Sequence, residues 1–199
     1  MVERLAERIV QWLIKNEAIC EEERELYKYA TFNRIFTLLP FLMIIPFCFK
    51  TNNILNGIIL CAVFLSLRKY IGGYHAKTPA QCWLYSSMLV MVLIYVATKI
   101  RNSGFILLFL LLAVCFIWVL SPIDSENRRL DTLERKKYRT YSRELSLLYL
   151  VFYGLLSILD KNVLAVSVAE GILFASILQL IGAFEQHLKK DKNVRNMSF

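Results

Sequence analysis

Residues 163–184, VLAVSVAEGILFASILQLIGAF, form the longest apolar stretch of the chain, and Glu170 is the only ionisable residue within it. About 20 consecutive apolar residues suffice for an α-helix to cross the hydrocarbon core of a bilayer. This stretch therefore predicts a transmembrane helix. The whole sequence agrees, because 57% of its residues are hydrophobic, only 20% are charged and its mean hydropathy is +0.47. A membrane protein is expected, and an ordinary water-soluble domain is not.

Further apolar segments precede this stretch, and they lie at residues 35–49, 53–67, 83–98, 104–120 and 145–159. The predicted fold class is therefore all-α, a polytopic membrane helix bundle of about six transmembrane segments with an additional N-terminal amphipathic helix. The segments at 35–49, 53–67 and 145–159 are short, because a rise of 1.5 Å per residue gives them barely ~21–24 Å. We expect them to thin the bilayer, to extend past these limits or to form a partial hairpin.

The chain is expected to be one membrane-integrated domain, residues 1–199, with an amphipathic N-terminal segment (1–30), a transmembrane bundle (35–184) and a basic cytoplasmic tail (185–199). In the N-terminal segment, apolar residues recur at helical spacing among charges: Val2, Leu5, Ile9, Trp12 and Leu13. This pattern indicates an amphipathic helix that lies on the membrane surface or on the bundle. A solvated leader helix docked on the core explains it equally well. A signal peptide is not expected, because Met1 to Lys28 mixes charges throughout.

Lysine and arginine residues are divided unequally between the two sides of these spans. The N-terminal segment carries six, the loop between the second and third spans three, the loop between the fourth and fifth spans seven, and the tail four. The other side carries only Lys50, Lys99, Arg101 and Lys161. The positive-inside rule therefore predicts that both termini and these two loops are cytoplasmic in a bacterial cell membrane. Headgroup contacts and orientation account for the net charge of +8, so nucleic-acid binding is not expected.

The loop RKYIGGYHAKTPAQC, residues 68–82, holds the residues best suited to chemistry. Thr78 is a favoured N-cap, Pro79 is tolerated at the first helical position, and Gln81 completes a capping box, so a helix is predicted to begin here. Cys82 then falls in the first turn of that helix. The unpaired backbone N–H groups and the helix dipole at such a position favour a thiolate over a thiol.

His75, one of two histidines, lies seven residues before Cys82. On one continuous helix the pair would be roughly 10 Å apart, too far for direct proton transfer. Pro79 disfavours helix at the preceding residue, and Gly72 and Gly73 permit backbone angles closed to other residues, so the loop can fold back. A cysteine nucleophile with a histidine base is then geometrically possible. Spacing alone favours a simpler alternative, a histidine in contact with headgroups beside an inert thiol.

The pair offers only two ligands to zinc, and the neighbouring sequence has no third of matching type, so no metal or cofactor is expected. The five cysteines do not suggest a disulfide framework, because their number is odd and three of them lie in apolar runs.

The run Arg68-Lys-x-x-Gly-Gly-x-His75-Ala-x-Thr-x-x-x-Cys82, followed by a span with Ser86 and Ser87, resembles the signature of the accessory gene regulator B (AgrB-like) family. These are bacterial membrane peptidases that mature quorum-sensing peptides. The chain length, the amphipathic N-terminal segment, the six spans and the turn Ser121-Pro122-Ile-Asp124-x-x-Asn127-Arg also resemble that family, so the likeness covers nearly the whole chain. The resemblance implies that His75 and Cys82 are the catalytic pair.

The resemblance also implies the reaction, in which a membrane cysteine endopeptidase cleaves the C-terminal part of an AgrD-like propeptide through an acyl-thioester on Cys82. An internal cysteine of the propeptide, or in some members a serine, then captures the acyl group as a thiolactone or lactone ring. The implied partners are the propeptide, membrane lipid and a second copy of the chain in a homodimer. Thioester exchange needs a thiol and a site that excludes water, and a site at the cytoplasmic membrane boundary meets both needs.

Other residues are candidates for supporting roles. Asp124 could orient His75, although an N-cap of the next cytoplasmic helix explains it as well. Gln81 could help to stabilise an oxyanion, although capping explains it equally. Glu170 is an ionisable side chain inside a predicted span, where such a group has a high energetic cost. It could face a polar groove, the propeptide or a dimer partner, or it could be buried and hydrogen-bonded. Further candidates for substrate binding are Arg68, Lys69, Arg128 and Arg129, and for the last two headgroup contact is favoured over an acidic propeptide tail.

Two non-enzymatic hypotheses remain. A membrane transporter or exporter of the peptide is supported by Ser167, Glu170 and Gln179 in the last span, and it predicts that Cys82→Ala leaves function intact. A membrane anchor that recruits partners through its basic cytoplasmic loops predicts that His75→Ala is harmless. Under this hypothesis, charge reversal in the loop between the fourth and fifth spans should abolish function.

Overall fold

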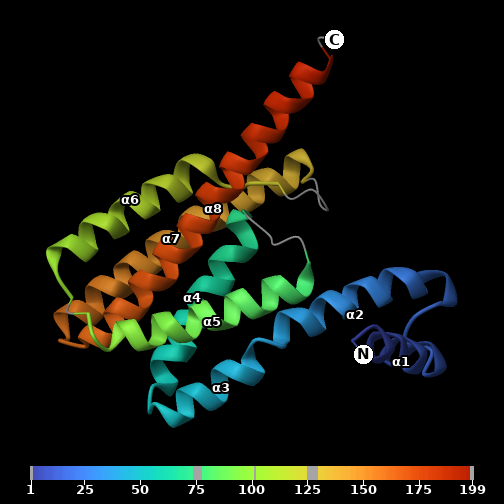
Figure 1. The fold of residues 1–199 in the computed structure, drawn as a ribbon, viewed down its shortest axis with the longest axis horizontal. Coiled ribbons are helices and arrows are strands. Elements are labelled where there is room, and N and C mark those ends of the chain that lie inside the picture. The colour runs from blue at the N-terminus through green and yellow to red at the C-terminus, as the bar shows by residue number, and fades with distance from the viewer. Residues whose placement is uncertain (1, 74–77, 101, 125–129, 198–199) are drawn as a thin grey trace.

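The computed structural model describes residues 2–73, 78–100, 102–124 and 130–197, with only the backbone given at Pro79, Ala80, Cys82 and residues 189–197. These residues form helices joined by short connections (Figure 1): α1 (Val2–Lys15), the 3-10 helix η1 (Glu21–Glu23), α2 (Arg24–Leu38), α3 (Phe41–Lys50), α4 (Ile54–Ile71), α5 (Pro79–Ala97), α6 (Gly104–Leu120), α7 (Thr132–Ile158) and α8 (Asn162–Met197). Within the described ranges, the only β-type pairing is an isolated bridge between Gly72 and Ile123. The all-α prediction is confirmed.

The predicted spans are all helical, but their limits differ from the sequence-based ones. The segment predicted at 35–49 is divided between α2 and α3, and the break falls at Pro40 because proline lacks an N–H and clashes with the preceding turn. The segments at 53–67 and 145–159 extend further, into α4 and α7. Among the described residues, three helical stretches are long and apolar enough to cross a bilayer, Glu21–Lys50, Ile54–Ile71 and Asn162–Leu188, and shorter apolar helices cover Trp83–Ala97 and Gly104–Leu120.

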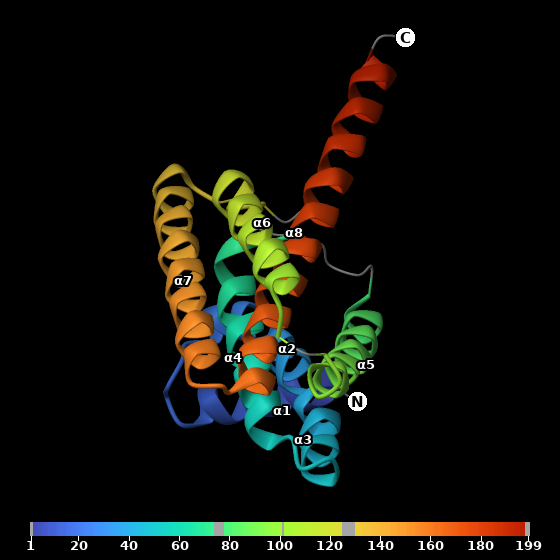
Figure 2. The same cartoon turned by 90° about the vertical axis from the view of Figure 1, so that its left-hand side faces the viewer.

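Helix α8 is the centre of the bundle, with α4, α6 and α7 packed around it and α5 in contact on another side (Figure 2). Its contact faces are rich in small residues, Ala165, Ala169, Gly171 and Ala175. A side chain at Gly171 would come within 2.9 Å of Val63 Cγ1 on α4. Small residues therefore let α4 and α8 approach closely, which favours helix association in a membrane through dispersion contacts.

Polar side chains join the helices across the bundle. Ser66 on α4 and the Tyr149 hydroxyl on α7 are 2.7 Å apart, and Trp118 Nε1 on α6 donates to Ser146 Oγ on α7 at 3.0 Å. Such bonds stabilise helix pairs in lipid, where an unpaired polar group has no water to bind.

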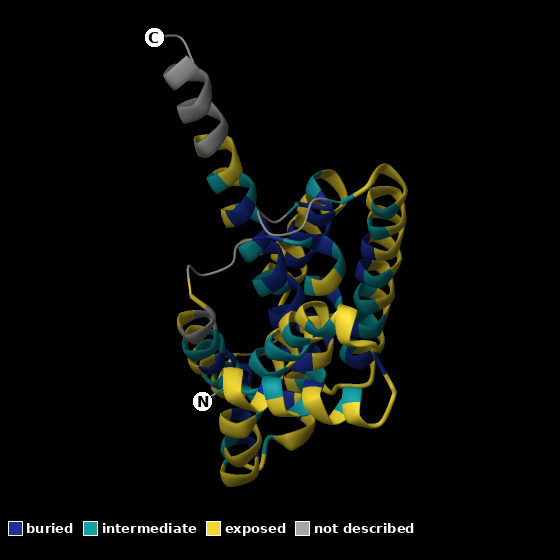
Figure 3. Cartoon of the chain, turned by 90° about the vertical axis from the view of Figure 1, so that its right-hand side faces the viewer, coloured by how far each residue is buried: buried dark blue, intermediate teal, exposed yellow. Residues whose placement is uncertain are grey.

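The outer surface of the bundle is apolar. Phe105, Val119 and Ile158 are 75–81% exposed, and exposed residues run along the outward faces of the helices while the interior is buried (Figure 3). An apolar surface of this extent on a soluble monomer would be unusual, whereas lipid chains cover it readily. The protein is a membrane protein.

The N-terminal segment, residues 1–30, is not one amphipathic helix; α1 and α2 form a hairpin there. All five of its periodic apolar residues lie in α1, which ends at Lys15, and α1 packs mainly on α2. Figure 1 shows this hairpin to one side of the bundle. Helix α2 continues past residue 30 to Leu38, so the N-terminal segment and the first span share a helix.

Candidate functional site

The glycine pair after α4 adopts backbone angles that favour glycine. Gly72 has φ of +70° and Gly73 has φ of +117°. A side chain at Gly72 would meet the carbonyl oxygen of Ile123 at 2.0 Å, and one at Gly73 would meet the Leu178 carbonyl oxygen on α8 at 2.7 Å. Both conformation and close approach therefore require glycine, which confirms that the pair breaks the helix before the loop.

Three segments distant in sequence meet at this pair. Gly72 forms the parallel bridge with Ile123, and the Ile123 N–H donates to the Ile71 carbonyl at 2.9 Å. Arg68 Nη1 on α4 donates to the Gly72 carbonyl at 2.5 Å. The loop that leads to residues 74–77 thus starts from a position fixed by α4, α8 and the connection after α6.

The start of α5 agrees with the predicted helix start at Thr78, but the described residues show no bond from the Gln81 side chain back to Thr78, so only half of the predicted capping box is present. Thr78 is extended, with φ of −124° and ψ of 144°, and its hydroxyl oxygen accepts from the Gln81 backbone N–H at 3.3 Å. Pro79 occupies the first helical position, and Cys82 lies in the first turn. The Gln81 side chain is exposed. His75 lies outside the described residues, as do Arg128 and Arg129, and the Cys82 side chain is not described.

Asp124 follows directly on the bridged Ile123. Its Oδ2 forms an ion pair with Arg135 at the start of α7, and its backbone carbonyl accepts from Gln186 Nε2 on α8. Its Oδ1 is buried without a hydrogen-bond partner among the described residues. The alternative that Asp124 caps the next cytoplasmic helix is wrong, because Asp131 caps α7 and forms a capping box with Glu134.

Arginines of α7 bind the end of α6, a role that the sequence analysis missed. Arg139 Nε donates to the Ser121 carbonyl and Arg143 Nη2 to the Trp118 carbonyl, both at 3.2 Å. Together with Arg135 they recur every fourth residue, so they share one face of α7. The last carbonyls of a helix lack partners within it and attract cations. These three arginines thus fix α7 to α6, and Arg135 positions Asp124.

Gln179 of α8 is fully buried beside the glycine pair. Its Nε2 donates to Ser121 Oγ at 2.8 Å, and its Oε1 has no hydrogen-bond partner in the described part of the chain. A side chain at Gly73 would approach Gln179 Cα to 2.9 Å. The sequence showed Gln179 only as a polar residue within a span; the structure shows that it joins α8 to the connection after α6.

The remaining candidate residues are separated. Lys69 Nζ lies 5.1 Å from the centre of the Tyr70 ring, which also packs against Tyr138 and Tyr141 of α7. Glu170 lies deeper in α8, and both of its carboxylate oxygens are buried with no hydrogen-bond partner among the described residues. The indole Nε1 of Trp83, next to Cys82, is likewise buried and unpartnered in the described ranges. A search of those ranges finds no group of three potential metal ligands.

Comparison with known proteins gives one family and two relatives. The model of the family described as accessory gene regulator B matches residues 6–182. An AgrB-like protein of Clostridium perfringens strain SM101 is 24% identical over 190 residues, which cover 89% of this chain and 87% of that protein. A second AgrB-like protein, from strain 13, is 24% identical over 171 residues, covering 80% and 78%. No solved structure matches the chain significantly.

Proposed function

Because the chain belongs to the accessory gene regulator B family, which is implicated in processing quorum-sensing propeptides, we propose that it is a membrane cysteine endopeptidase with Cys82 as nucleophile and His75 as base. The observation that carries the proposal is the capped start of α5. Thr78 fixes the helix N-terminus, and Cys82 lies in the first turn beyond it. A helix N-terminus lowers the pKa of a cysteine thiol and so supplies a thiolate.

The proposed first step is acyl transfer to the enzyme. His75 takes the thiol proton of Cys82, and the thiolate attacks the carbonyl carbon of the scissile peptide bond. The C–S bond forms, the C–N bond breaks, and the imidazolium gives its proton to the leaving amine. The products are an acyl-thioester on Cys82 and the released C-terminal part of an AgrD-like propeptide.

The proposed second step closes the ring. The thiol of an internal propeptide cysteine loses its proton to His75 and attacks the thioester carbonyl, and the proton then passes to the departing Cys82 thiolate. One thioester replaces another, so the acyl group remains activated as a thioester throughout the exchange. A propeptide serine in the same place would give a lactone. Water must be kept from the intermediate, and a site at the edge of the apolar bundle supports that requirement.

Asp124 is proposed as the residue that orients His75. Support comes from the bridge between Gly72 and Ile123, because the chain leaves this bridge toward His75 on one side and reaches Asp124 on the other. Oδ1 of Asp124 has no partner among the described residues and is available to an imidazole N–H, while Arg135 keeps the carboxylate in place through Oδ2. A carboxylate in this role fixes the imidazole tautomer. The side-chain amide of the exposed Gln81 is proposed as an oxyanion donor.

The site is proposed to face the cytoplasm, with both termini on the same side. The distribution of lysine and arginine supports this orientation. The propeptide and a second copy of the chain are the proposed partners. For the propeptide, Lys69, Arg128 and Arg129 are proposed contacts, whereas Arg68 is already bonded to Gly72.

The transporter hypothesis has less support than it had from the sequence. Of its three polar residues in the last span, Ser167 donates to the Val163 carbonyl and Gln179 donates to Ser121, so both serve the fold. Glu170 alone remains without a partner among the described residues. A polar path along α8 is therefore not favoured.

The test is cleavage of a candidate propeptide by the full-length protein purified in lipid. We expect Cys82→Ala and His75→Ala to abolish cleavage, with Cys20→Ser as the matched control, because Cys20 is an exposed thiol in the N-terminal hairpin. Wild-type cleavage by Cys82→Ala would refute the proposal, and unchanged peptide export by the same variant would favour the transporter.

A further inference from the structure

Helix α1 has an apolar arc that α2 leaves uncovered. Ala6 and Val10 are fully buried, whereas Leu5 is 48% and Trp12 is 63% exposed. With about 100° between successive residues, Leu5, Ile9 and Trp12 share an arc of about 60° next to the buried face, with Ile9 partly buried at its edge. The apolar surface of α1 is thus wider than the face that α2 covers.

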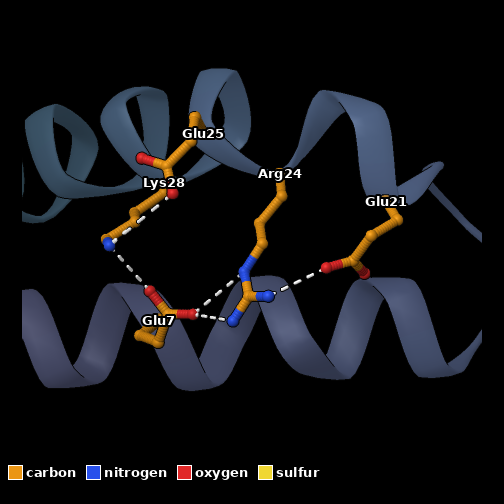
Figure 4. Close-up of polar contacts among 5 residues, drawn as sticks. All are labelled: Glu7, Glu21, Arg24, Glu25 and Lys28. Carbon is orange, nitrogen blue, oxygen red and sulfur yellow. Dashed lines mark hydrogen bonds and ion pairs between the residues drawn. The ribbon is translucent and has the colours of Figure 1, made fainter.

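Ion pairs fix this orientation of α1 (Figure 4). Glu7 Oε1 accepts from Arg24 Nε at 3.1 Å and Nη2 at 2.5 Å, and Lys28 Nζ lies 2.9 Å from Glu7 Oε2. The hydrogen bonds from Arg24, and then those from Lys28, lower the pKa of Glu7 below its ordinary value. Glu7 therefore faces α2 as a carboxylate, and the opposite side of α1 stays open.

The exposed half of α1 also carries charge of one sign. Arg4, Arg8 and Lys15 are exposed and lie with Gln11 on an arc of about 60° that adjoins the Trp12 arc. The two acidic residues of α1, Glu3 and Glu7, lie on the side toward α2. Arg4 and Arg8 also border the groove of about 740 Å³ between α1 and α2, which Glu3, Glu7, Glu25 and Lys28 line with them. That groove therefore carries both signs of charge, and its charge selects no ligand.

We propose that the exposed half of α1 docks on an anionic lipid surface, with Leu5, Ile9 and Trp12 at the boundary between headgroups and acyl chains and with Arg4, Arg8 and Lys15 at the phosphates. An apolar arc beside a basic arc is the arrangement of helices that lie in the membrane plane, and a tryptophan ring favours this depth. The position of α1 supports this occupant, because α1 is held on α2 and α2 continues into the candidate span Glu21–Lys50. This inference does not depend on the proposed peptidase activity.

The test uses the full-length protein in vesicles that contain phosphatidylglycerol with brominated acyl chains, which quench nearby tryptophan. The difference between wild type and Trp12→Phe isolates the fluorescence of Trp12. We expect brominated lipid to quench Trp12 and aqueous acrylamide to leave it largely unquenched. Quenching by acrylamide alone would overturn the proposal, and so would protection from both quenchers, because a second copy or a peptide would then cover this face.

Two further variants sharpen the test. In Trp12→Phe/Gln11→Trp the indole moves to the basic arc, so we expect less quenching by brominated lipid and more by acrylamide. Charge reversal in Arg4→Glu/Arg8→Glu should lower the ratio of docked to undocked α1 by about fivefold or more per charge in phosphatidylglycerol vesicles, because each basic side chain near an anionic surface contributes about that factor. In phosphatidylcholine vesicles the reversal should change little, and an equal loss in both lipids would contradict the assignment to anionic lipid.

Discussion

At the scale of single residues, the glycine pair determines where the loop with His75 begins. Gly73 lies against α8 and against the guanidinium of Arg68, whose Nη1 would be 2.4 Å from an added Cβ. This position leaves no room for any side chain. The geometry of the loop therefore depends on Gly73 as much as on the residues that would carry out the chemistry.

We expect Gly73→Ala to lower both thermal stability in lipid and propeptide cleavage. The strain of a non-glycine residue at this φ costs on the order of 1–3 kcal/mol, and the contact with the α8 backbone adds to it. Gly154→Ala within α7 is the matched control, because no atom lies within 4 Å of its added Cβ, and it should leave cleavage unchanged without lowering thermal stability. Full cleavage by Gly73→Ala would show that the loop does not need this position.

Asp124→Asn should slow acylation of Cys82 and shift the pH profile of the rate, because an amide holds the imidazole in the wrong tautomer and cannot stabilise the imidazolium. Arg135→Met, which removes only the ion pair, should reduce the rate without the same change in the profile. The measurement is the single-turnover rate of cleavage against pH. An unaltered pH profile for Asp124→Asn would show that Asp124 pairs with Arg135 but does not orient His75.

At the scale of elements, the N-terminus of α5 is the part proposed to activate Cys82. Replacement of an N-cap threonine by alanine costs about 0.5–2 kcal/mol of local helix stability. We therefore expect Thr78→Ala to slow alkylation of the Cys82 thiol by iodoacetamide, and Thr78→Ser to restore it. Thr98→Ala at the other end of α5 is the control, since among the described residues Thr98 Oγ1 donates only to the Tyr95 carbonyl. Equal alkylation rates for Thr78→Ala and wild type would show that the Thr78 cap does not affect the reactivity of the Cys82 thiol.

The hairpin of α1 and α2 should respond to acid through Glu7. Its pKa is lowered from 4.5 by Arg24 and Lys28, so the ion pairs stabilise the hairpin above that ordinary value and are lost as pH falls toward the lowered pKa. Spin labels at Gln11 and Tyr27 should show a broader distance distribution as the pH falls below 4.5. Glu7→Gln should show it at neutral pH, whereas Glu3→Gln should not. A narrow distribution for Glu7→Gln at neutral pH would contradict this role of the carboxylate.

At the scale of the whole molecule, the proposed orientation in the membrane is based on the distribution of lysine and arginine. An impermeant maleimide should label Lys161→Cys, in the exposed connection between α7 and α8, from outside intact cells. The exposed Cys20 should react only after the membrane is opened. Labelling of Cys20 in intact cells would reverse the proposed orientation and place the candidate site outside the cytoplasm.

The sequence predicted local features well, because a few neighbouring residues determine them. Apolar runs located the helices, Gly72 and Gly73 marked the break after α4, and Thr78 marked the start of α5. Features that join distant segments could not be predicted. Periodicity does not show that Gly72 pairs with Ile123, that Gln179 binds Ser121 or that α1 folds back on α2. The relation of His75 to Cys82 stays a prediction, since His75 lies outside the described residues.

The role of Cys82 as nucleophile is tested by the intact mass of the full-length protein after brief reaction with a propeptide whose internal cysteine is replaced by alanine. Ring closure is then blocked, so the acyl-enzyme should accumulate. We predict an added mass equal to the N-terminal part of the propeptide, sensitive to hydroxylamine and located on the peptide that contains Cys82. Cleavage without any adduct, or an adduct that persists in Cys82→Ser at another residue, would contradict Cys82 as the nucleophile.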